Sequence, residues 1–188
     1  MEYVLGIDYG TLSARAIVVE SKTGRTLGEC THAYAHGVID EKLPDGTPLA
    51  GSGWALAHPA DYKDALIAIV SGAIKNAGIP SEKVRALAIA ATACTLVPVD
   101  KSLSPLCLFP QFSGHPHAYA KLWKHHRAQP CADRMTQIAR EMEPKMLERY
   151  GGRISSEWAI PKIMEIYYED STVYHAASLF MQISDWLT

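Results

Sequence analysis

The chain has 188 residues, 48% of them hydrophobic and 20% charged, so it has enough apolar material for a sizeable core of one or two domains. Its formal net charge of -2 provides no broad basic surface for nucleic acid, and we expect no nucleic-acid partner. The apolar runs are too short to span a bilayer, and residues 1–4 lack the basic start of a secretory signal. We therefore expect no membrane partner and a cytoplasmic location.

Three apolar runs rich in β-branched residues open the chain and predict an antiparallel meander of strands. Short turns containing Gly, Asp or Lys separate them. The three runs cover residues 3–8, 14–20 and 26–34. No helical pattern lies between them, so this opening is not a β-α-β unit.

A long loop rich in Gly, Pro and Asp covers residues 36–59. Pro59 then begins a predicted helix of about five turns, and Gly78 suits the position just past its end. The apolar run at 84–91 predicts a buried strand, and after an interruption residues 96–99 resume it.

The remainder of the chain is expected to be mostly helical, with Pro130 and the Gly151-Gly152 pair as breaks. A short strand is expected at 106–109, and the predicted helices cover 117–127, 131–150, 160–169 and 172–187.

The four cysteines form no C-x-x-C pair and are expected to be free thiols. Because the last helical pattern has no stop signal, we expect the chain to be truncated.

The turn between the first two predicted strands contains the residue types that phosphoryl transfer needs. Asp8 ends its strand and offers a carboxylate for Mg²⁺, and Gly10 allows the backbone to approach a phosphate closely. Thr11 and Ser13 add hydroxyl groups, and Arg15 adds a positive charge. The same turn taken alone fits an ordinary hairpin, because Asp and Gly are common in turns.

The longer stretch from Gly6 to Ala16 resembles the first phosphate loop of the FGGY carbohydrate kinases, which belong to the actin-like, ribonuclease H-like ATPase superfamily. Further segments resemble, within that family, the ribulokinases. They are HGVID at 36–40, LPDG at 43–46, WAL at 54–56 with HP at 58–59, TACT at 92–95 with PVD at 98–100, PLCL at 105–108, PHAY at 116–119, KLWKHH at 121–126, and YGG at 150–152 with ISSEW at 154–158. The resemblance covers essentially the whole chain but only the leading part of a full-length family member.

The resemblance implies an α/β fold with a mixed sheet that opens with the meander and is flanked by helices. It implies ATP and Mg²⁺ as cofactors, with Asp8 positioning the metal and Gly10, Thr11, Ser13 and Arg15 facing the phosphates. It also implies ATP-dependent phosphorylation of the terminal hydroxyl of a ketopentose such as L-ribulose, in arabinose or pentose catabolism.

The resemblance places Thr92, Ala93, Cys94 and Trp123 near the sugar. Residues 1–188 would form the N-terminal lobe, truncated and without its C-terminal lobe. No catalytic residue is expected in this chain, because the general-base aspartate of the family lies beyond the position of Thr188. We therefore expect the isolated chain to be inactive.

Two residues depart from the family pattern. Relatives usually have Asp and Phe where this chain has Ala90 and Ala91. The change is expected to remove a hydrogen-bond acceptor and open volume beside the sugar pocket, so the sugar preference stays open. The alternatives are another FGGY kinase acting on xylulose or ribitol, or a non-catalytic actin-fold module that binds a sugar or nucleotide. A homodimer also stays open.

Several other polar residues are expected to lie on the surface. His115, His117, His125 and His126 are the densest group of potential metal ligands, but adjacent histidines on a helix diverge and do not chelate one ion well. Lys121, Lys124 and Arg127 are expected to form a solvated basic face with them. Glu157 receives no role.

Overall fold

The computed structural model describes residues 2–188, and the predicted meander forms one edge of its larger sheet. Its strands are β1 (Tyr3–Tyr9), β2 (Ser13–Glu20) and β3 (Thr26–Ala33). The strand β5 (Val84–Ala91) pairs in parallel with β1, so the sheet order is β3-β2-β1-β5. The expected mixed sheet is therefore present, and its only parallel pair brings the end of β5 beside the end of β1.

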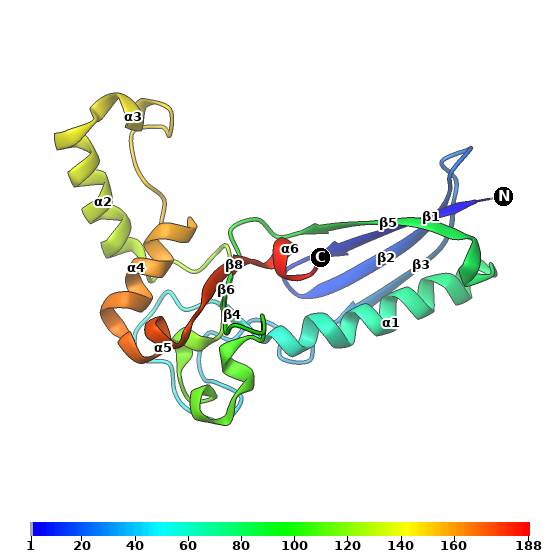
Figure 1. The fold of residues 1–188 in the computed structure, drawn as a ribbon, viewed down its shortest axis with the longest axis horizontal. Helices are drawn as coiled ribbons and strands as arrows, with labels where there is room; N and C mark the ends of the chain where they lie inside the picture. Colours follow the sequence, from blue (N-terminus) through cyan, green and yellow to red (C-terminus); the bar gives the residue numbers. More distant parts are fainter. Residues whose placement is uncertain (1) are drawn as a thin grey trace.

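The helix α1 (Pro59–Ala77) covers one face of this sheet (Figure 1). His58 caps its first turn by accepting a hydrogen bond from the Ala60 N–H, and Gly78 ends it in the left-handed conformation with φ 63°. Gly28 of β3 permits close contact with α1, since a Cβ at this residue would lie 2.3 Å from the backbone nitrogen of Ala77. The apolar residues of β1 and β2 pack beneath α1.

A second, smaller sheet lies beyond the amino-terminal end of α1 (Figure 1). Its strands run in the order β4-β7-β6-β8. They are β4 (Leu56–Ala57), β7 (Ala120–Lys121), β6 (Leu96–Val99) and β8 (Leu179–Gln182). All pairings within this sheet are antiparallel, and the most distant partners, Leu96 and Gln182, are 86 positions apart in sequence.

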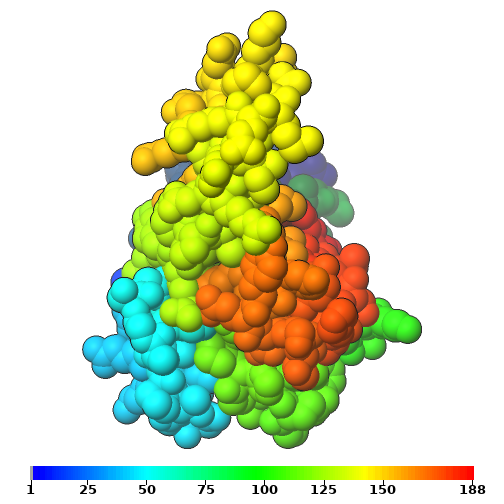
Figure 2. Space-filling model, turned by 90° about the vertical axis from the view of Figure 1, so that its left-hand side faces the viewer, coloured from blue at the N-terminus to red at the C-terminus, as the bar shows by residue number. Residues whose placement is uncertain are grey.

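Most of the remaining helices pack around the second sheet. They are α2 (Gln129–Met142), α3 (Pro144–Glu148), α4 (Ala159–Glu169), α5 (Ser171–Ala176) and α6 (Ile183–Trp186). The pair α2 and α3 projects from the body of the molecule as a narrow tip, yellow in Figure 2. Short 3-10 turns cover Ser81–Lys83, Leu106–Leu108, Pro110–Phe112 and Pro116–Ala118. Within the described residues, no helix is both long and apolar enough to cross a membrane.

Four sequence predictions about secondary structure were wrong. The strand expected at 106–109 is a 3-10 turn, and the helix expected at 117–127 is a 3-10 turn followed by β7 and further turns. The helix expected at 172–187 is divided into α5, β8 and α6, because Ser178 and β8 hydrogen-bond to β6. The helix expected at 131–150 breaks at Glu143, directly before a proline. Pairing across the sheet overrides local helical preference in the second and third cases.

Candidate functional site

The turn between β1 and β2 presents its polar groups at the edge of a shallow cavity. The N–H of Gly10 donates to the carbonyl of Ser13 at 2.9 Å, and a Cβ at Gly10 would lie 3.1 Å from that oxygen. Asp8 and Arg15 are cross-strand neighbours, both exposed on the sheet face opposite α1. A cavity of about 360 Å³ lies over this face, and its lining includes both side chains.

A second pocket of about 330 Å³ lies beyond the end of β5, and we call it the polar pocket for the hydroxyl and carboxylate side chains among its lining residues. Thr92, Ala93, Cys94, Trp123 and Glu157 line it. The structure thus brings together the four residues for which the resemblance implied sugar contacts and adds Glu157, to which sequence reasoning gave no role. Part of the signal for Glu157 was present in the ISSEW segment, but its partners are distant in sequence.

Two hydrogen bonds attach this pocket to the turn. The N–H of Thr92 donates to the carbonyl of Tyr9 at 3.1 Å, which fixes the pocket to the last residue of β1. The indole N–H of Trp123 donates to Oγ1 of Thr11 at 3.1 Å, across 112 positions of sequence. Residues expected to face phosphate and residues expected to face sugar are therefore in direct contact.

Comparisons with known proteins identify the family. The sequence profile of the FGGY family of carbohydrate kinases, N-terminal domain, matches residues 3–188. The chain belongs to the FGGY family of carbohydrate kinases.

Two curated relatives are ribulokinases. The one from Shouchella clausii is 45% identical over 185 residues, which is 98% of this chain and 33% of the relative. The one from Geobacillus thermodenitrificans is 44% identical over 186 residues, which is 99% of this chain and 33% of the relative. This FGGY chain therefore spans about a third of the length of the curated relatives that it matches.

Solved structures agree on the fold. A gluconate kinase from Lactobacillus acidophilus matches with a TM-score of 0.71 at 16% identity, over 99% of this chain and 32% of that one. The α/β, actin-like fold expected from the sequence is confirmed.

A buried lysine of this FGGY domain joins two walls of the polar pocket, and sequence reasoning missed it. Nζ of Lys162, on α4, donates to the carbonyl of Cys94 at 2.6 Å and to the carbonyl of Leu122 at 2.8 Å. Lys162 is fully buried, and burial lowers its pKa to about 8. Cys94 adopts a left-handed backbone with φ 59° in the turn between β5 and β6, where the sequence predicts an interruption of the strand.

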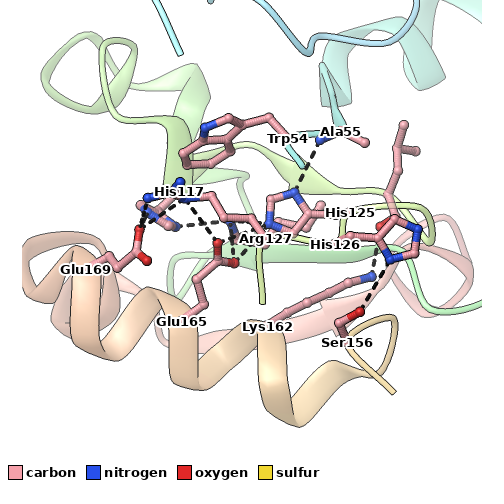
Figure 3. Close-up of polar contacts among 12 residues, drawn as sticks. Trp54, Ala55, His117, His125, His126, Arg127, Ser156, Lys162, Glu165 and Glu169 are labelled. Carbon is pink, nitrogen blue, oxygen red and sulfur yellow. Dashed lines mark hydrogen bonds and ion pairs between the residues drawn. The ribbon is translucent and has the colours of Figure 1, made fainter. Parts of the chain in front are cut away.

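The segment that carries Trp123 also contributes to a charged cluster, which we define as Lys121, His117, His125, Glu165 and Arg127. Figure 3 labels all of these residues except Lys121. The Glu165 carboxylate lies 3.2 Å from the Lys121 ammonium, 2.9 Å from Nε2 of His125 and 3.6 Å from Nε of Arg127. The ammonium and guanidinium groups also lie over the Trp54 ring, at 5.0 and 4.7 Å from its centre. The expectation of a solvated face was wrong for Lys121, His117 and His125, which are buried.

Hydrogen bonds fix the protonation of the charged cluster. Nδ1 of His125 accepts from the Ala55 N–H at 3.3 Å, so the ring proton lies on Nε2 and is donated to Glu165. Burial and the Lys121 charge lower the pKa of His125 to about 4 and that of His117 to about 3. Burial alone would raise the pKa of Glu165, but the His125 hydrogen bond and the Lys121 charge outweigh it and lower that pKa to about 2.

Another group of potential ligands lies near the start of α1. Donor atoms of His36, His58 and Asp61 are all within 4.8 Å of one another, and they are the only such group among residues 2–188. The two rings stack at 4.3 Å with 19° between their planes, so their in-plane lone pairs run side by side and do not converge on one ion. Nδ1 of His36 instead lies 2.7 Å from the Asp61 carboxylate, and this contact joins the loop before α1 to its first turn.

A larger hollow lies elsewhere. It measures about 860 Å³, opens to the surface between α1 and β5, and has a lining that is almost entirely apolar. It contains none of the residues of the turn or the polar pocket, so its chemistry gives no reason to place a reaction there.

Proposed function

We propose that the protein containing this chain transfers the terminal phosphate of ATP to the terminal hydroxyl of a ketopentose such as L-ribulose, and that this chain forms its N-terminal lobe. The observation that carries the proposal is the hydrogen bond between Trp123 and Thr11. This hydrogen bond joins the glycine-containing turn to the small polar pocket. The aromatic ring and the carboxylate that line the pocket are groups that suit a sugar. The 45% identity to a ribulokinase favours L-ribulose over other sugars.

The turn fits the phosphate end of the reaction. Gly10 leaves the backbone open where a side chain would press on the Ser13 carbonyl, and the exposed Asp8 carboxylate is a suitable ligand for Mg²⁺ or its waters. When bound, Mg²⁺ neutralises charge on the phosphate oxygens. In this proposal Gly10, Thr11, Ser13 and Arg15 face those oxygens, and Arg15 adds a fixed positive charge.

The polar pocket fits the sugar end. Trp123 provides an apolar face, and the Glu157 carboxylate, which has no hydrogen-bond donor to its side chain among the described residues, can accept from sugar hydroxyls. Thr92, Ala93 and Cys94 supply the turn against which the sugar lies. The general base that removes the hydroxyl proton would come from the part of the protein beyond residue 188.

The test uses the product of the complete gene that encodes this chain. ADP release is measured with L-ribulose, xylulose, ribitol and other polyols. Turnover with L-ribulose supports the proposal, and turnover with a different sugar alone keeps the kinase but refutes the substrate. Folded protein that binds ATP and phosphorylates no sugar would show a non-catalytic binding module. The variant Asp8→Asn is measured in the same assay as a matched control. It keeps the shape of the turn and removes the charge proposed to bind the metal, so ADP release should fall.

A further inference from the structure

Two segments that are distant in sequence contribute to the lining of the polar pocket. One is the turn at 92–94 that follows β5, and the other is the segment after β7 that carries Trp123. Lys162 bonds to both, through the carbonyls of Cys94 and Leu122. We propose that Lys162 is a positioning residue that holds these walls at the separation the sugar requires. The proposal rests on the proposed function and deepens it.

The contacts of Lys162 are of a kind that fixes geometry. Hydrogen bonds from an ammonium group are shorter and stronger than neutral ones, and the two here measure 2.6 and 2.8 Å. Burying a full charge is costly unless such bonds compensate for it. An apolar side chain of the same length would fill the space without that cost. A lysine at this position is therefore explained by the two backbone carbonyls that its ammonium group binds.

The conformation of Cys94 supports the same inference. A non-glycine residue with φ 59° is in an uncommon region and persists only where surrounding contacts favour it. The Lys162 ammonium supplies such a contact at the carbonyl of that very residue. Without it, the turn at 92–94 is free to relax toward a more common backbone, and the pocket changes shape.

Lys162 acts on the pocket through other residues and does not line it. The other fully buried lysine nearby, Lys121, has a different arrangement, because its ammonium contacts the Glu165 carboxylate and a histidine. Lys121 thus belongs to the charged cluster, whereas both backbone acceptors of Lys162 belong to pocket walls.

The experiment compares Lys162→Met with a control variant, Ile166→Ala, in the complete gene product. Ile166 lies one turn further along α4, is fully buried and does not contact the pocket, so its truncation loosens the same helix. Two quantities are measured. One is the rate at which iodoacetamide alkylates Cys94 without sugar, read by mass spectrometry of the Cys94 peptide. The other is the set of KM and kcat values with L-ribulose, or with whichever sugar the panel identifies.

The proposal predicts that Lys162→Met accelerates alkylation of Cys94 about tenfold and raises the sugar KM about tenfold, since two charge-assisted bonds are lost. The KM for ATP should stay within about twofold of the wild-type value, and Ile166→Ala should change neither readout comparably. Equal alkylation rates in the two variants would overturn the inference. If Lys162→Met does not fold, Lys162→Gln removes the charge with a polar side chain and is judged by the same criteria.

The two proposals fail separately. If the wild-type protein phosphorylates no sugar, the proposed function fails. The alkylation rate of Cys94 then still decides whether Lys162 holds the turn, because that readout requires no sugar.

Discussion

The charged cluster behind the pocket makes a sharp prediction about Glu165. Its carboxylate is 1% exposed and is the sole acidic partner of the buried Lys121 ammonium among the described residues. The substitution Glu165→Gln keeps the side chain's size and removes its charge. Lys121 then stays buried without an opposite charge, and His125 donates to a neutral amide in place of a carboxylate.

The magnitude follows from the burial of both partners. Removing one member of a buried ion pair costs about 3–5 kcal/mol, because the remaining charge is uncompensated. For a domain of this size, roughly 2–4 °C of melting temperature is lost per kcal/mol, so we expect a fall of about 6–20 °C. Urea denaturation of the purified protein measures the free energy of unfolding directly.

Glu169→Gln is the matched control. Glu169 lies one turn further along the same helix and pairs with Arg127 at 2.7 Å, but it is 40% exposed. Exposed pairs contribute about 0–1 kcal/mol, so this variant should stay close to the wild type. If the two variants lose the same stability, the buried carboxylate is not neutralising Lys121 and the reasoning is refuted. The double variant Lys121→Met with Glu165→Leu should recover part of the loss, because no unpaired ammonium remains.

Three further predictions follow from the same contacts. His117 and His125 have folded pKa values of about 3 and about 4, below the ordinary 6.5, so the unfolded state binds their protons first and the protein loses stability as the pH falls below 6.5, by about 2 kcal/mol per pH unit between pH 6 and pH 4. Equal urea midpoints at pH 7 and pH 5 would contradict this. Glu157→Gln should raise the sugar KM about tenfold and leave the KM for ATP unchanged, and an unaltered sugar KM would remove the carboxylate from sugar recognition. The Tyr62 hydroxyl is buried without a partner among residues 2–188, whereas that of Tyr119 donates to a carbonyl at 2.8 Å. Tyr62→Phe should therefore be neutral or stabilising and Tyr119→Phe should cost about 1 kcal/mol, and the opposite order in thermal unfolding would show that the Tyr62 hydroxyl is paired.

The elements that sequence predicted well are those whose signals are local. The meander follows from alternating or apolar runs separated by turns, and its bounds agree with β1, β2 and β3 to within about two residues. The helix α1 begins at Pro59 and ends before Gly78, as its start and stop residues indicate. Each of these signals lies within a few residues of the feature that it specifies.

The elements that sequence missed depend on distant partners. Residues 117–127 carry polar side chains at helical spacing, but the chain forms β7 because β4 and β6 lie on either side of it. In the sequence, Lys121 has the features of a surface residue. Its buried partner Glu165 is 44 positions further along the chain, and only the structure shows the two charged groups 3.2 Å apart. The role of Lys162 depends in the same way on two carbonyls 68 and 40 positions distant. No local pattern distinguishes such residues from solvated ones.

The register of β5 changes the meaning of the departure from the family pattern. Because side chains alternate along a strand, Ala90 and Ala91 face opposite sides of the sheet. Ala90 pairs with Asp8 and lines the cavity that Asp8 and Arg15 share, whereas Ala91 pairs with Tyr9 and packs against the core under α1. Neither lines the polar pocket, although Ala91 directly precedes Thr92, which does, so the effect of the two alanines on the sugar stays a prediction. The acidic group that relatives usually carry at position 90 would therefore lie beside Asp8 and Arg15.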